Sequence, residues 1–185
     1  MDLQVASHHP CRWLVLIDGE DQRAPDAFSN FKTGFCPRTA INKIPQSVLH
    51  GREDGAPPPV DLAKERAHAE YVRQLIHDST VNAVHDVADG GLLVALTEMA
   101  LASGRGCVLT DIDDAATAFG EDQARYLIAT SFDKAEALMA AASAAGVPIA
   151  MVGKFGGDKM RMGGSEASLA SLASIFRSAF EKAVA

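Results

Sequence analysis

The feature that most constrains the fold is the alternation of helix-like and strand-like segments that runs from Asp61 to the end of the chain. Asp61 is suited to cap a helix, because its carboxylate accepts hydrogen bonds from the free amides of the first turn. Apolar residues then recur at helical spacing to about Asp78. This pattern predicts a helix whose inward face consists of Leu62, Ala69, Val72, Leu75 and Ile76.

Short apolar segments between the helical patterns predict strands. Gly156 and Gly157 separate the last two of these segments and predict an antiparallel hairpin, since glycine adopts the positive φ that a tight turn requires. A hairpin does not fit a purely parallel sheet, so the expected fold is α/β (α+β), a mixed β-sheet with helices packed on it. The expected strands are residues 81–87, 107–109, 126–129, 149–155 and 159–162.

Three further helices are expected between and after these strands. Gly90 and Gly91 open the first, which ends at Gly104, a residue type that favours the left-handed end of a helix. Asp133 is expected to cap the second, over residues 134–145. Ser168 is expected to cap the last, whose predicted inward face consists of Leu169, Leu172, Ile175, Phe176, Ala179 and Phe180.

The first fifty residues differ from the rest of the chain. Residues 13–17 are apolar and fit one buried strand, but residues 18–50 follow neither helical nor strand periodicity. Unpatterned stretches of this length are uncommon inside compact domains. We therefore expect a divergent N-terminal segment over residues 1–50, with one strand and an irregular loop, and an α/β domain over residues 51–185.

The charge balance excludes several classes of partner. With 17 Lys and Arg against 24 Asp and Glu, the net charge is −7, so neither a general nucleic-acid surface nor an anionic-membrane surface is expected. No apolar run approaches the roughly 20 residues of a membrane helix, and the first residues lack a secretory pattern. The three cysteines show no Cys-x-x-Cys spacing, which favours reduced thiols and a cytoplasmic protein.

Residues 84–92 are the best candidate for chemistry. They run from the end of a predicted strand, through a polar turn, into a helix that begins with Gly90 and Gly91. Bare amides and the positive end of the helix dipole would attract a phosphate there. Asp86 and Asp89 could bind a cation or orient hydroxyls, and His85 could move a proton or bind phosphate. The alternative is a structural turn in which Asp86 or Asp89 only caps the helix.

Several motifs, taken in order, resemble the large subunit of phosphoribosylformylglycinamidine synthase. The resemblance covers roughly residues 51–185 and also the strand that opens near Trp13. The motifs are Gly55-Ala56-Pro57-Pro58-Pro59-Val60-Asp61-Leu62, His85-Asp86-Val87-Ala88-Asp89-Gly90-Gly91-Leu92, Phe119-Gly120-Glu121-Asp122-Gln123-Ala124-Arg125-Tyr126-Leu127, Gly146-Val147-Pro148, and Val152-Gly153 with the turn Gly156-Gly157-Asp158.

The resemblance implies a fold and an activity. That family uses ATP and glutamine-derived ammonia to amidate formylglycinamide ribonucleotide in purine biosynthesis, which makes it an ATP-dependent C–N ligase. Its large subunit has two homologous halves, and this chain resembles the C-terminal domain of the second half, a fold shared with aminoimidazole ribonucleotide synthetase. The implied partners are the ATP-binding domains of the same enzyme and a glutaminase domain or subunit.

The resemblance also implies where the chemistry lies. ATP and Mg²⁺ belong to the full enzyme, whose catalytic histidine, metal ligands and ATP loops lie in domains absent from this chain. We therefore expect no catalytic residue, no metal ligand and no fully bound cofactor in the chain alone. In the family's first half, the stretch that corresponds to residues 121–123 touches the nucleotide substrate. The resemblance implies that the matching copy in the second half, to which this chain corresponds, is not the working substrate site. Glu121, Gln123 and Arg125 are substrate candidates by this correspondence, with a polar strand entrance as the alternative.

Residues 19–50 depart from the family pattern. A glycine-rich turn and a strand are expected there by resemblance, whereas the chain has scattered prolines and aromatic residues. We interpret this block as a locally frameshifted or otherwise scrambled remnant, and translation of the coding DNA in the other two frames tests that interpretation. The expected function is that of a truncated enzyme fragment that is not competent alone. The alternatives are a freestanding phosphate- or nucleotide-binding module and a non-functional product.

Overall fold

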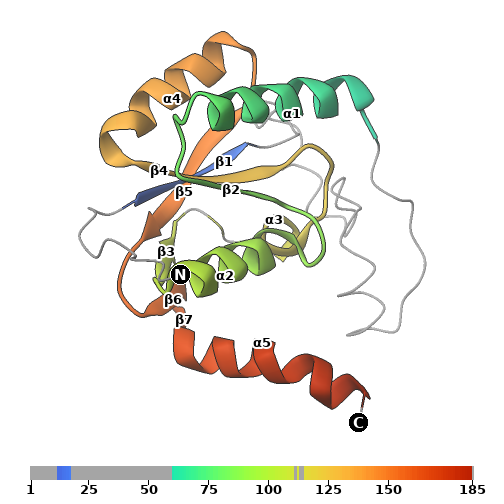
Figure 1. Cartoon of the computed structure of the whole chain (residues 1–185), viewed down its shortest axis with the longest axis vertical. Helices are drawn as coiled ribbons and strands as arrows, with labels where there is room; N and C mark the ends of the chain where they lie inside the picture. Colours follow the sequence, from blue (N-terminus) through green and yellow to red (C-terminus); the bar gives the residue numbers. More distant parts are fainter. Residues whose placement is uncertain (1–11, 18–59, 111, 113–114, 185) are drawn as a thin grey trace, which may run out of the picture.

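A mixed β-sheet forms the centre of the molecule in the computed structural model, which describes residues 12–17, 60–110, 112 and 115–184 (Figure 1). Its seven strands lie in the order β2-β4-β1-β5-β3-β6-β7. The strands are β1 (Arg12–Ile17), β2 (Ala83–Asp86), β3 (Cys107–Leu109), β4 (Tyr126–Ser131), β5 (Ile149–Phe155), β6 (Lys159–Met162) and β7 (Ser165–Ser168). The helices are α1 (Leu62–His77), α2 (Gly91–Ser103), α3 (Ala115–Phe119), α4 (Phe132–Ala144) and α5 (Leu169–Val184).

Strand pairing confirms the expected mixed sheet. The pair β3 and β6 is parallel, whereas the other neighbouring pairs are antiparallel. Strand β7 and helix α3 lie outside the expected elements. The two are short, at 4 and 5 residues, which gives little room for a periodic pattern.

The predicted hairpin between β5 and β6 is wrong. Strand β3 lies between them, antiparallel to β5 and parallel to β6. The glycine turn holds β3 in place, because the Gly156 amide donates to the Gly106 carbonyl and the Gly106 amide donates to the Gly157 carbonyl, both at 2.8 Å. The hairpin that does form joins β6 to β7, and Gly163 at its turn has a φ of +56°.

The predicted strand near residues 13–17 is confirmed as β1, and it lies in the middle of the sheet. Its register pairs Leu14 with Ala129 of β4 and with Gly153 of β5. Leu14, Val15 and Ile17 are all fully buried. The division of the chain at residue 50 stays a prediction, because residues 18–59 lie outside the described residues.

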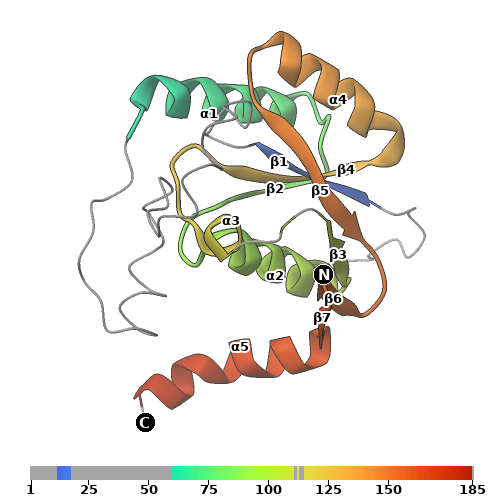
Figure 2. The same ribbon diagram turned by 180° about the vertical axis from the view of Figure 1, so that it is seen from behind.

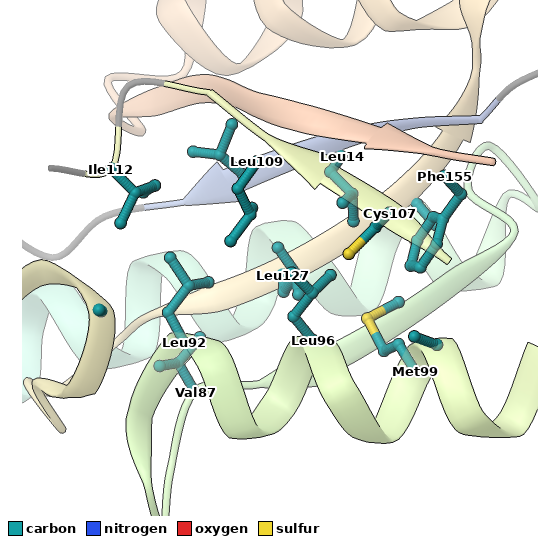
Figure 3. Close-up of a cluster of buried hydrophobic side chains, with 14 residues drawn as sticks. Leu14, Val87, Leu92, Leu96, Met99, Cys107, Leu109, Ile112, Leu127 and Phe155 are labelled. Atoms are coloured by element: carbon teal, nitrogen blue, oxygen red, sulfur yellow. The ribbon is translucent and has the colours of Figure 1, made fainter. Parts of the chain in front are cut away.

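Two cores cover the two faces of the sheet, as Figures 1 and 2 show from opposite sides. On one face, Leu92, Leu96 and Met99 of α2 pack against sheet residues such as Leu14 and Leu127 (Figure 3). On the other face, α1 and α4 pack against alternate residues of the same strands. That second core consists of Val15, Ile17, Val72, Leu75, Ile128, Leu138, Ala142 and Val147.

Capping was predictable for most helices. Asp61 accepts hydrogen bonds from the amides of Ala63 and Lys64, and Ser168 accepts one from Ser171. Gly104 ends α2 with a φ of +66°. One expectation was misplaced: Ser131 is the N-cap of α4, and Asp133 lies in its first turn.

The predicted inward faces of α1 and α5 are partly wrong. Leu62 and Ile76 of α1 are 74% and 55% exposed, whereas Val72 and Leu75 of the same helix are buried. Ile175 and Phe176 of α5 are 62% and 56% exposed, and Ala179 is exposed too. Helix α5 lies beside α2, away from the sheet (Figures 1 and 2), and only the start of α5 joins the core, through Leu169. The Phe180 side chain lies outside the described residues.

Candidate functional site

The candidate site lies where edge strand β2 turns into α2, opposite the loop that joins α3 to β4 (Figure 1). Gly90 and Gly91 have φ angles of +89° and +74°, which other residues adopt only with strain. A β-carbon on Gly91 would lie 2.5 Å from the carbonyl carbon of Phe119. Glycine at this position therefore lets the start of α2 pack directly on the backbone that leads into the loop.

Two amides at the start of α2, those of Gly90 and Gly91, donate to groups of the chain itself. The Gly90 amide donates to Oε1 of Glu121 at 2.6 Å, and the Gly91 amide donates to the Ala88 carbonyl at 2.9 Å. The carboxylate of Glu121 thus lies at the positive end of the helix, where a phosphate would otherwise bind. The amides of Gly90 and Gly91 are therefore not bare, in contrast to the expectation for this turn.

His85 is fixed between two oxygen atoms. Its Nδ1 donates to the Asp86 carbonyl at 2.7 Å, and its Nε2 lies 3.1 Å from Oε2 of Glu98. A carbonyl oxygen only accepts, so the bond to Asp86 places a proton on Nδ1. Neither ring nitrogen is open to an incoming ligand in this arrangement.

Arg125 faces the inside of the protein. Its side chain donates to the carbonyl of Gly120 at 2.9 Å and to that of Thr117 at 3.4 Å, and the residue is 2% exposed. Its own carbonyl accepts a hydrogen bond from the Val87 amide at 3.0 Å. Arg125 therefore ties the loop to α3 and to the end of β2.

The remaining candidates are open to solvent. The side chain of Asp86 is 69% exposed, and Asp89 and Gln123 are also exposed. Two of these three residues are acidic, and within the described residues no three His, Cys, Asp or Glu side chains are grouped as a metal site would require. The acidic open surface of the site thus does not favour a phosphate.

Two residues of this region were not expected from the sequence. Glu98 of α2 pairs with His85 of β2, and no local sequence pattern indicates this pairing. His68 of α1 is 3% exposed, and its Nδ1 lies 2.9 Å from the Ala124 carbonyl in the loop. His68 precedes Val72 by four residues and Leu75 by seven, so its place on the inward face was readable from helical spacing.

Tyr126 connects the site to the opposite face of the sheet. Burial raises the pKa of its phenol, and the negative charges of Glu65 and Asp86 raise it further. Tyr126 pairs with Asp86 in the β2–β4 register. The phenol therefore senses the charge on Asp86 at the edge of the site.

Comparison with known proteins identifies the domain. Residues 41–163 match the family described as AIR synthase related protein, C-terminal domain. The PurL subunit of phosphoribosylformylglycinamidine synthase from Ruegeria sp. (strain TM1040) is 53% identical over 149 residues, which cover 78% of this chain and 20% of that subunit. The chain thus spans about a fifth of the length of this relative. The resemblance read from the motifs is confirmed.

Solved structures of PurL from Thermotoga maritima share the fold. Phosphoribosylformylglycinamidine synthase II has a TM-score of 0.64 at 16% identity and covers 89% of this chain with 26% of its own. PurL from the same organism, complexed with ATP, has a TM-score of 0.60 at 16% identity and covers 88% of this chain with 25% of its own. The PurLQS structure from the same organism has a TM-score of 0.63 at 16% identity and covers 88% of this chain with 26% of its own.

No helix among the described residues is both long enough and apolar enough to span a membrane. The family match extends over two thirds of the sequence, from residue 41 to residue 163. The mixed sheet agrees with it, since solved PurL structures superimpose on most of the chain. The chain belongs to the family of AIR synthase related proteins, C-terminal domain.

Proposed function

We propose that this chain acts as the C-terminal domain of a phosphoribosylformylglycinamidine synthase large subunit, in the ATP-dependent amidation of formylglycinamide ribonucleotide. The observation that supports this most directly is the 53% identity to the PurL subunit of Ruegeria sp. over 149 residues. The chain contributes one wall of a substrate cleft, and the groups that bind ATP and Mg²⁺ are supplied by other domains. It is not competent alone, and it works in the cytoplasm beside those domains and a glutaminase.

The geometry of the site supports a wall rather than an independent phosphate-binding module. The amides of Gly90 and Gly91 donate within the chain, and Arg125 donates to backbone carbonyls. Asp86, Asp89 and Gln123 remain exposed and can face a substrate that neighbouring domains hold. A freestanding phosphate site would instead need cations or free amides at this surface.

Reconstitution in trans tests the proposal. The Ruegeria PurL subunit, lacking the segment that matches this chain, is combined with the 185-residue chain, and ADP formation is measured with formylglycinamide ribonucleotide, ammonia and ATP. We expect no turnover from either piece alone and turnover from the pair. The matched positive control is the Ruegeria subunit's own segment supplied in trans. Restoration by that segment and none by this chain contradicts the proposal and favours a non-functional product.

Calorimetric titration of the chain with inorganic phosphate and with ATP addresses the alternative module. We expect no saturable heat with either ligand, because the amides of Gly90 and Gly91 already donate within the chain and the Glu121 carboxylate lies at the positive end of α2. Submillimolar phosphate binding that a Gly91→Ala substitution abolishes would favour the freestanding module. ATP hydrolysis by the chain alone would contradict the assignment of the ATP machinery to other domains.

A further inference from the structure

His68 is one of three buried polar or charged residues in the described part of the chain, and two of them, His68 and Arg125, meet the same loop. His68 belongs to α1, which covers one face of the sheet, whereas α2 covers the other. The loop between α3 and β4 passes between these two helices at the edge of the sheet. A side chain that fixes this loop from α1 therefore acts on the start of α2.

The backbone that His68 contacts is strained. Ala124 has a φ of +64°, a left-handed conformation that L-residues with a β-carbon seldom adopt, and it is 7% exposed. Such a conformation persists only where the surroundings hold it. Here the Ala124 carbonyl lies 2.9 Å from His68 Nδ1, and the neighbouring Arg125 is bonded to Gly120 and Val87.

The left-handed residue and Glu121 belong to the same short loop. Ala124 lies in a turn directly before Arg125 and the start of β4, and Glu121 lies three residues earlier. Oε1 of Glu121 accepts from the Gly90 amide at 2.6 Å. The contact of His68 with Ala124 and the bond of Glu121 with Gly90 thus involve one loop, at positions three residues apart.

We infer that His68 is a positioning residue, whose Nδ1–H holds Ala124 in its left-handed conformation and thereby keeps the Glu121 carboxylate on the Gly90 amide. A carbonyl oxygen only accepts, so this role requires the proton on Nδ1. His68 itself touches none of the exposed candidates, Asp86, Asp89 or Gln123. Its importance for amidation rests on the proposed function, whereas its effect on the loop does not.

Two substitutions separate the donor from the bulk of the side chain. The amide nitrogen of His68→Asn occupies nearly the position of Nδ1 and keeps the donor, whereas that of His68→Gln occupies nearly the position of Nε2 and removes it. His77, on the same helix with a side chain 73% exposed, provides matched controls as His77→Asn and His77→Gln. The readout is hydrogen exchange of the Gly90 amide, measured by NMR in the full chain.

We expect Gly90 exchange to accelerate about tenfold in His68→Gln, since a lost bond to a buried carbonyl is of that size, and to change less than about twofold in His68→Asn. Neither His77 variant should change it. Equal acceleration in both His68 variants, or none in either, overturns the inference. Long-range ¹⁵N–¹H NMR of the unsubstituted chain is decisive even if a variant fails to fold: Nδ1 must be protonated, and an unprotonated Nδ1 overturns the inference.

Turnover of the reconstituted enzyme tests whether the role of His68 matters for amidation. Turnover should fall with His68→Gln and be restored with His68→Asn. If the unsubstituted chain restores no turnover, the proposed function fails while the exchange and NMR measurements still decide the role of His68. If turnover is restored and is equally unaffected by both variants, the positioning role in amidation is overturned and the proposed function stands.

Discussion

Oε1 of Glu121 lies 2.6 Å from the backbone nitrogen of Gly90, across 31 residues of sequence. This one bond joins the loop before β4 to the start of α2. It also places a negative charge at the positive end of a 13-residue helix. Glu121 thus acts as the cap that α2 lacks locally, because Gly90 at the N-cap position has no side chain.

Replacing Glu121 separates its charge from its capping bond. Glu121→Ala leaves the Gly90 amide without its acceptor and should lower the free energy of unfolding by about 1 kcal/mol, as loss of an N-cap does. Glu121→Gln keeps an acceptor oxygen and loses only the charge–dipole attraction, about 0.5 kcal/mol. Urea unfolding followed by circular dichroism measures both. Equal losses for glutamine and alanine would show that the bond contributes nothing beyond the charge–dipole attraction.

Gly91 is the residue at the start of α2 whose β-carbon would clash with backbone atoms. A β-carbon there would lie 2.5 Å from the Phe119 backbone, and the φ of +74° adds strain. Gly91→Ala should therefore cost about 2–4 kcal/mol of unfolding free energy, from the clash and the strain together. Gly104→Ala is the control, because its φ is +66° but nothing lies within 4 Å, so only strain of about 1 kcal/mol applies. Equal urea midpoints for the two variants would contradict the clash.

Cys107 should be unreactive in the folded chain. Burial raises the pKa of its thiol from 9.0 to about 12, so the reactive thiolate is about a thousandfold scarcer at pH 8 than in the unfolded chain. Labelling with a chromogenic disulfide tests this in a Cys11→Ser and Cys36→Ser background. We expect slow reaction in buffer and rapid reaction in urea.

The same raised pKa has a consequence for stability. Below pH 9.0 the thiol is neutral in both the folded and the unfolded chain, so the contribution of the buried thiol to the free energy of unfolding is fully present. That contribution is lost as the pH rises from 9.0 toward about 12. Cys107→Ala should therefore flatten the alkaline decline in unfolding free energy. Native labelling at pH 8 as fast as in urea would contradict both expectations.

Local features of the fold were predictable, and non-local ones were not. The Asp61 cap depends on amides two and three residues away, which sequence spacing fixes. The place of β3 between β5 and β6 depends on contacts between Gly106 and residues about fifty positions later. The glycine turn at 156–157 looks the same whether the next strand pairs with β5 or lies beyond β3.

The candidate site shows the same division. The sequence indicated a polar turn followed by a helix, and the structure places Asp86, Asp89 and Gln123 on its surface. Whether the amides of that turn were free depended on Glu121, which the chain brings from another loop. The apolar spacing of α5 likewise predicted a buried face, but spacing does not tell which element covers a face, and Phe176 is 56% exposed.

Titration of Tyr126 reports the charge at the edge of the site. The chain has two tyrosines, so in a Tyr71→Phe background the absorbance at about 295 nm follows Tyr126 alone. Burial first, then the charges of Glu65 and Asp86, raise its pKa above 10.0, so the neutral phenol stabilises the fold below pH 10.0 and that contribution is lost as the pH rises. Asp86→Asn should lower the midpoint, because a repelling charge is removed, whereas Asp89→Asn should leave it unchanged. Equal shifts from both variants would mean that the phenol senses only net charge, not Asp86 beside it in the β2–β4 register.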